Sequence, residues 1–142
     1  MPHLVILYTP NLDAQTDMTA LCRALADTML LQVDEAGKAV FPPGGTRVLA
    51  YPAAHCAVGD DGTAGRAAGG SGEYAFMYLN LRMGGGRSDA VKNTAGEALL
   101  EKAKAHLAPV FATQHLGLTV QVDEGVQAYD GKHSTLHPLF PK

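Results

Sequence analysis

The stretch YAFMYLNLRMGGGRSDAVKNTAGEALLEKAKAHLAPVF, Tyr74–Phe111, joins an alternating segment to a helical one through three glycines. Residues 74–83 predict a strand, because one face carries only apolar side chains: Ala75, Met77, Leu79, Leu81 and Met83. Ser88 is the expected N-cap of the next element, and Asp89 suits the positive end of a helix dipole. Apolar residues then recur at helical spacing to about Phe111: Val91, Ala95, Ala98, Leu99, Ala103, Leu107 and Val110. The stretch therefore predicts a strand followed by a helix.

A second strand completes this unit. Residues 116–124, LGLTVQVDE, alternate like a half-buried strand, with Leu118, Val120 and Val122 on one side. Two strands joined by a helix form a βαβ unit, whose crossover helix lies on one face of the sheet.

The first half of the chain repeats the same order. HLVILY, residues 3–8, is a short apolar run and predicts a strand buried on both faces. Thr16 or Asp17 can cap a helix whose apolar face comprises Met18, Leu21, Cys22, Leu25 and Met29. FPPGG interrupts the chain, and TRVLAY, residues 46–51, predicts another strand.

These two units predict one α/β (α+β) domain over residues 1–142, with a four-stranded sheet and two helices on one face. The βαβ halves span residues 1–56 and 73–124. Between them, residues 57–72 are rich in glycine and alanine and predict a flexible surface loop or a short hairpin extension. Residues 125–142 form a C-terminal tail, too short and broken for a core element.

Composition excludes several classes of protein. Hydrophobic residues make up 46% of the 142 residues and charged residues 18%, which is typical of a globular chain. The net charge of −3 and the scattered Lys and Arg residues disfavour nucleic acid as a partner. No apolar run approaches the ~18 residues of a membrane span, so we expect no membrane association and a cytoplasmic protein. Cys22, Cys56 and the histidines lack metal-ligand spacing, so we expect no metal site.

The predicted sheet leaves one face uncovered. Phe76 and Tyr78 lie opposite the aliphatic row of their strand, and the tail adds Leu136, Leu139 and Phe140. A monomer with this pattern would expose a large apolar patch, which soluble monomers avoid. We therefore expect a symmetric oligomer whose subunits pack sheet to sheet.

Three residues are candidates for a functional site, although each can also have a purely structural role. Pro2 can simply be a proline tolerated at the start of a strand. Arg47, after the glycine-rich turn, is either a solvated strand-end residue or a carboxylate ligand with a planar fork. Arg87 is either a loop residue or an anion ligand just before a helix N-terminus.

The sequence resembles the tautomerase superfamily, and within it the 5-carboxymethyl-2-hydroxymuconate isomerases. The matching segments are MPHLVI, FPPGGTRV, LRMGGGRSDAVKNTAGEALLEKAKAHL, LTVQVDE and HPLF. The resemblance implies a homotrimer of double βαβ subunits without a cofactor. It also implies an isomerase for an unsaturated 2-hydroxy or 2-oxo di- or tricarboxylic acid, acting in aromatic catabolism such as homoprotocatechuate degradation.

The resemblance also implies roles for single residues. Pro2, freed of Met1, is the general base, and Arg47 and Arg87 bind the carboxylates of a small-molecule substrate. Arg82 is a weaker candidate that can equally line a subunit interface. His137 and Phe140 match a C-terminal segment that packs near the pocket, and His3 is a structural residue behind Pro2.

Elementary chemistry supports this role for Pro2. An α-amino group titrates at roughly 8, and both burial and nearby arginines disfavour its protonated form. Pro2 is then neutral enough to accept a proton and acidic enough to return it. Two alternatives stay open: another tautomerase-superfamily activity (a 2-oxo acid tautomerase or a dehalogenase or hydratase), and an inactive trimeric binding protein that retains Met1.

Overall fold

A single four-stranded sheet organises the chain in the computed structural model, which describes residues 2–141. The strands are β1 (His3–Tyr8), β2 (Arg47–Pro52), β3 (Tyr74–Gly84) and β4 (His115–Gly125), in the order β2-β1-β3-β4. β1 runs parallel to β2, β3 runs parallel to β4, and the two central strands are antiparallel. The prediction of two βαβ halves sharing one sheet is confirmed.

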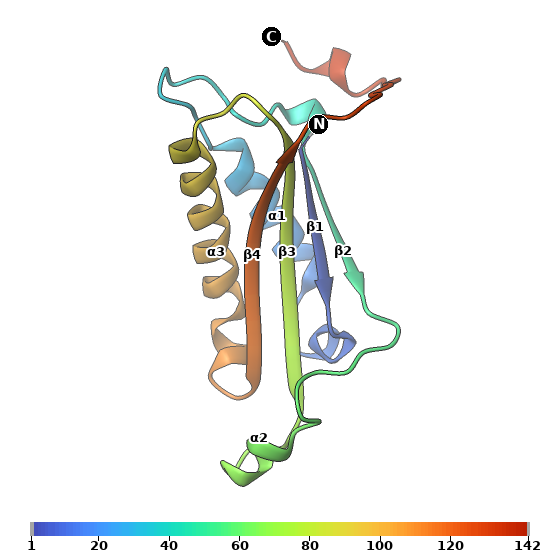
Figure 1. Ribbon diagram of the computed structural model, residues 1–142, viewed down its shortest axis with the longest axis vertical. Helices are drawn as coiled ribbons and strands as arrows, with labels where there is room; N and C mark the ends of the chain where they lie inside the picture. Colours follow the sequence, from blue (N-terminus) through green and yellow to red (C-terminus); the bar gives the residue numbers. More distant parts are fainter. Residues whose placement is uncertain (1, 142) are drawn as a thin grey trace.

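The two long helices cover the same face of this sheet (Figure 1). The N-cap of α1 (Met18–Leu30) is Asp17, whose Oδ1 accepts a hydrogen bond from the Ala20 N–H at 2.9 Å. The N-cap of α3 (Asp89–Phe111) is Ser88, whose Oγ accepts a hydrogen bond from the Val91 N–H at 3.2 Å. Ser88 was the expected cap, and Asp17 is the one used of the two residues that could cap the first helix.

The core lies between the helices and the covered face of the sheet. Alternate residues of each strand point into it, with Leu4 and Ile6 from β1 and Met77 and Leu79 from β3 completely buried. The helices contribute a row of buried residues: Leu21, Leu25, Met29, Val91, Ala95, Leu99, Ala103, Leu107 and Val110. Cys22 packs against this core as predicted, although it is only partly buried.

The other face of the sheet is open, as predicted for a single subunit with both long helices on one side. Within one subunit β1 alternates between buried and accessible residues, and the burial of its second face stays a prediction that depends on the assembly. Leu7 is 47% exposed, Leu49 45% and Tyr51 50%. Leu7 pairs with Tyr51, and Val5 with Leu49, so these side chains form a contiguous patch. We call the patch of Val5, Leu7, Leu49, Tyr51 and Phe76 the open apolar face.

The glycine-rich insertion differs from the predicted loop or hairpin. It contains a short helix, α2 (Thr63–Ala67), at the end of the molecule opposite the two termini (Figure 1). Asp60 Oδ2 accepts from the Ala64 N–H at 2.9 Å, and the Tyr74 hydroxyl accepts from the Gly65 N–H at 2.9 Å. A Cβ on Gly65 would lie 2.8 Å from the Tyr74 ring, so only glycine permits this close packing.

Three 3-10 turns complete the fold: η1 (Pro10–Ala14), η2 (Pro43–Gly45) and η3 (His137–Leu139). η3 belongs to the tail that follows β4, and it packs against η2, the turn that precedes β2. Within residues 2–141, no helix is both long and apolar enough to cross a membrane.

Candidate active site

The strand directions gather four segments at one end of the sheet. β1 and β2 are parallel and start side by side, with His3 opposite Arg47. β3 is antiparallel to β1, so its last turn arrives at the same end, where Arg82 faces His3. β4 is parallel to β3, and the tail therefore also leaves from this end (Figure 1). The start of the chain, the η2 turn, the loop before α3 and the tail consequently meet.

A pocket of about 280 Å³ lies at this meeting point. Its wall is formed by Pro2, Phe41, Pro42, Gly45, Met83, Gly84, Arg87, Lys132 and His137. Pro2 is buried, and Phe41 and Met83 give the pocket an almost completely buried apolar side. The structure thus brings the predicted site residues Pro2 and Arg87 to one cavity that combines apolar surface with positive charge.

A hydrogen bond to a backbone carbonyl holds the Arg87 side chain in place. Its Nη2 donates a hydrogen bond to the Val40 carbonyl at 2.8 Å, which ties the loop before α3 to the segment before η2. Because a carbonyl is neutral, this contact leaves the guanidinium charge uncompensated. In the described chain, residues 2–141, Arg87 makes no ion pair with a carboxylate, so its charge is available to an anionic ligand.

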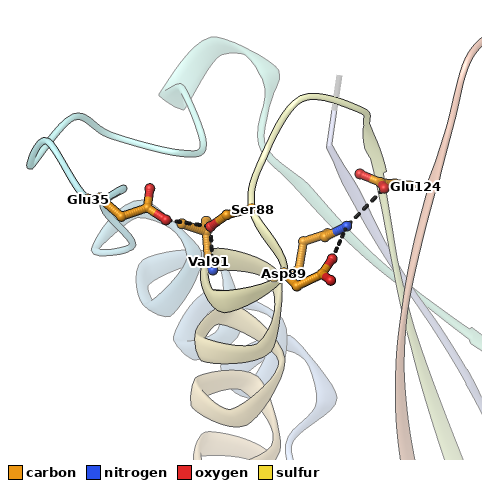
Figure 2. Close-up of polar contacts among 6 residues, drawn as sticks. Glu35, Ser88, Asp89, Val91 and Glu124 are labelled. Atoms are coloured by element: carbon orange, nitrogen blue, oxygen red, sulfur yellow. Dashed lines mark hydrogen bonds and ion pairs between the residues drawn. The ribbon is translucent and has the colours of Figure 1, made fainter.

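Polar contacts fasten the start of α3, directly after Arg87 in the chain, to two other segments (Figure 2). Ser88 Oγ donates to Glu35 Oε1, and this contact lowers the pKa of Glu35. On the other side, Lys92 Nζ pairs with Glu124 at 2.8 Å and with Asp89 at 3.0 Å. Both contacts raise the pKa of Lys92, chiefly the one with Glu124. α3 is thereby joined to the end of β4, which fixes the loop that carries Arg87.

Arg47 lies in a neighbouring cleft instead of the Pro2 pocket. The cleft is larger, about 920 Å³, and His3 and Arg82 line it as well. Arg47 is half-buried at the start of β2, and its Nη1 donates to the Gly45 carbonyl at 3.2 Å. Met83, Gly84 and Lys132 line both cavities, so the cleft and the pocket adjoin each other.

His3 contributes little positive charge to this cleft. Burial lowers the pKa of His3 below its usual value of 6.5, and the positive charges of Arg47, the amino terminus and Arg82 lower it further. His3 is therefore mainly neutral near pH 7. It separates the two arginines, as its pairing with both Arg47 and Arg82 shows.

The Arg82 side chain lies on the uncovered face of the sheet, where it donates a hydrogen bond. Its Nε donates to Asn80 Oδ1 at 2.6 Å, and Asn80 Nδ2 donates to Asp123 Oδ2 at 2.8 Å. Asn80 is only 2% exposed, so this chain of contacts satisfies a buried amide. Arg82 accordingly joins the rim of the cleft to the sheet.

The tail supplies two further residues to the pocket. His137 approaches η2 so closely that a Cβ on Gly44 would lie 2.8 Å from His137 Nδ1. Lys132 was missed in the sequence, because it lies in an irregular segment with no period or motif. Phe140 is 43% exposed and does not line the pocket.

The described residues offer no cluster for a metal ion: nowhere in residues 2–141 do three or more His, Cys, Asp or Glu side chains gather suitably. What this end of the sheet does offer is an apolar pocket with the positive charges of Arg87 and Lys132. The adjoining cleft adds Arg47 and Arg82, together with the carboxylates of Asp123, Glu124 and Asp130. Such an arrangement suits a small molecule that carries carboxylates at intervals.

Comparisons with known proteins agree with this arrangement. A sequence model of the 5-carboxymethyl-2-hydroxymuconate isomerase family matches residues 2–140. A 5-carboxymethyl-2-hydroxymuconate Delta-isomerase from Escherichia coli is 26% identical over 140 residues, which cover 99% of each chain.

Two solved structures are similar over nearly the full length. A crystal structure of 5-carboxymethyl-2-hydroxymuconate delta-isomerase is 58% identical, with a TM-score of 0.96, over 100% of this chain and 94% of the other. A 5-carboxymethyl-2-hydroxymuconate isomerase from Deinococcus radiodurans R1 is 31% identical, with a TM-score of 0.80, over 99% of this chain and 95% of the other.

Proposed function

Because this chain belongs to the 5-carboxymethyl-2-hydroxymuconate isomerase family, we propose that it isomerises an unsaturated 2-hydroxy acid of the carboxymethyl-hydroxymuconate type with Pro2 as the base. The observation that carries the proposal is the burial of Pro2 in a pocket that also contains Arg87. The protein is an enzyme, an isomerase of the tautomerase type. Its reaction belongs to the breakdown of aromatic compounds.

Pro2 becomes a secondary amine when Met1 is removed. The apolar surroundings of the pocket and the charge of Arg87 both oppose protonation of this amine, which lowers its pKa from the roughly 8 of a free α-amino group. The neutral amine accepts the proton of the substrate hydroxyl, and the electron pair moves through the conjugated chain. The prolinium then returns the proton to a distant carbon, so the reaction needs neither oxidant nor reductant.

The arginines account for the charges of such a substrate. Arg87 is positioned to bind one carboxylate inside the pocket, and Arg47 a second one in the adjoining cleft. A guanidinium can hold a carboxylate through two parallel hydrogen bonds and stays charged at any physiological pH. Binding at two separated points would align the conjugated chain beside Pro2.

We further propose that the protein is a homotrimer. The open apolar face includes four large hydrophobic side chains that are more than a third exposed: Leu7, Leu49, Tyr51 and Phe76. A second copy of the chain would bury this face, and closed symmetry would repeat the contact without leaving a free patch. We place the enzyme in the cytoplasm, where thiols such as those of Cys22 and Cys56 stay reduced.

The decisive experiment compares protein with and without Met1 at equal trimer content. Intact mass identifies the two forms, and kcat/KM is measured on a carboxymethyl-hydroxymuconate and on phenylpyruvate. We expect turnover of the muconate only after Met1 removal, with kcat/KM rising with pH through one ionisation below that of a free terminal amine. Equal activity of the two forms would rule out Pro2 as the base. Preference for phenylpyruvate would favour a different tautomerase activity, and inactivity of both forms a binding protein.

A further inference from the structure

Lys132 lines both cavities of the candidate site, whereas Arg87 and Arg47 each line only one. It lines the Pro2 pocket together with Arg87, and it also lines the cleft that contains Arg47. The only other residues shared by the two cavities are Met83 and Gly84, which carry no charge. Among the described residues of the two walls, Lys132 is therefore the single charged group at the junction.

The ammonium of Lys132 is able to bind a further anion. It pairs with Asp130 at 2.5 Å, which is an exposed contact between residues two positions apart. An ammonium group has three N–H donors, and this pair uses one of them. The Lys132 side chain is 42% exposed, so a ligand in either cavity can reach it.

The tail holds Lys132 at this place although the segment is neither helix nor strand. On one side, η3 packs on η2, and the missing Cβ of Gly44 allows His137 to approach. On the other side, the Tyr129 hydroxyl packs against Gly131 within the same exposed segment. Lys132 thus lies a few residues before the contact that joins the tail to η2.

We propose that Lys132 binds a third carboxylate of the substrate, between those held by Arg87 and Arg47, and so makes the enzyme prefer tricarboxylates to dicarboxylates. The inference rests on the proposed function, because it assumes that the substrate extends from the pocket into the cleft. Three cations then face three carboxylates. A substrate without this third carboxylate loses only the contact with Lys132.

The test combines turnover with binding of unreactive acids. kcat/KM is measured for 5-carboxymethyl-2-hydroxymuconate and for 2-hydroxymuconate, which lacks the carboxymethyl group. Dissociation constants of propane-1,2,3-tricarboxylate and glutarate are measured by calorimetry. The variants are K132Q, which removes the charge, and K132R, which keeps it. K104Q is the matched control, since Lys104 lies on α3 and pairs only with Glu101, at 3.1 Å, among the residues that the structure describes.

We expect K132Q to weaken kcat/KM and binding of the tricarboxylates about tenfold, the worth of one charged hydrogen bond. The dicarboxylates should change about twofold or less, because the lost charge has no partner on them. K132R should retain most of the preference, and K104Q all of it. An equal loss on both substrate classes, or no loss on either, would overturn the proposal.

The two proposals can fail separately. If the native enzyme isomerises neither muconate, the proposed function is wrong, and the calorimetric comparison alone decides the role of Lys132. If the native enzyme isomerises the tricarboxylate but K132Q discriminates as well as the native protein does, the function stands and Lys132 has no part in specificity.

Discussion

Arg87 and Arg47 differ in their immediate surroundings, and this makes their separate roles testable. Arg87 donates to the carbonyl of Val40 beside Pro2, whereas Arg47 donates to the carbonyl of Gly45 and faces the cleft. The acceptor of the Arg87 contact is a neutral carbonyl, so the charge of Arg87 is available to a ligand. We expect both arginines to act on the substrate by charge and by the geometry of the guanidinium fork.

Alanine at either position should lower kcat/KM on a muconate by roughly 100-fold, because a substrate carboxylate would lose its charged partner. Arg87→Lys should also be impaired, since an ammonium cannot form the planar fork. Steady-state kinetics checks both expectations. Arg23→Ala is the control, because Arg23 pairs with Asp27 on the exposed side of α1. Near-normal kinetics of both alanine variants would show that the arginines are surface residues.

Sequence reasoning reached part of this site and missed part of it. The position of Pro2 before a strand and of Arg87 before a helix cap follow from local patterns, and the structure brings these residues together. Arg47 lines a second cavity instead of the Pro2 pocket. This placement depends on the path of the η2 turn just before it, which no local sequence pattern predicts. Lys132 escaped because the tail is positioned by distant contacts with η2 instead of by its own periodicity.

At the scale of elements, the contact between η2 and η3 decides whether the tail reaches the site. η3 lies in a segment whose residues are mostly exposed, and its packing against η2 depends on the bare backbone of Gly44. A contact with so little buried surface is easily opened.

Gly44→Ala should release the tail, because the new Cβ would lie 2.8 Å from His137 Nδ1 and 3.0 Å from the His137 Cα. We expect faster amide hydrogen exchange in residues 136–140 and a lower kcat/KM on the muconate. Gly85→Ala serves as the control, since no atom lies within 4 Å of its added Cβ. Unchanged exchange and kinetics in Gly44→Ala would mean that the site does not need the docked tail.

Side-chain patterns predict the type of each long element, whereas contacts from outside an element do not follow from its own pattern. The stripe from Val91 to Val110 predicted α3 because six of its residues face one core. The apolar run of β1 predicts burial on both faces; the helices of one subunit cover one face, and the burial of the other depends on a second subunit. The glycine- and alanine-rich composition of residues 57–72 predicts a loop or hairpin, because it has no amphipathic pattern, and so α2 is not predicted. It forms through Asp60 and Tyr74, which supply contacts from outside the helix.

At the scale of the whole molecule, the open apolar face is the surface on which the proposed assembly depends. Its residues come from β1, β2 and β3, so the face extends from the edge strand β2 across the two central strands of the sheet. The covered face already has its helices (Figure 1). We therefore expect association to occur through the open side.

Leu49→Asp should convert the trimer to monomer, because a carboxylate buried in an apolar contact is strongly unfavourable. Light scattering at micromolar concentration measures the mass, and circular dichroism checks that the subunit stays folded. Leu31→Asp is the control: Leu31 is also exposed, but it lies at the end of α1, away from the open face. A native protein of monomer mass, or a trimeric Leu49→Asp variant, would contradict the proposed assembly.

The position of α2 at the far end of the molecule has a practical consequence for labelling. Both termini lie at the end that carries Pro2 and Lys132, so an affinity tag on either would crowd the pocket (Figure 1). Cys56 instead follows the opposite end of β2, in the connection to α2, and its thiol is exposed. Cys22 is half-buried, and burial raises the pKa of its thiol, so it holds less of the reactive thiolate. A maleimide dye should therefore attach selectively at Cys56, giving a fluorescent reporter or surface tether without engineering and far from the chemistry.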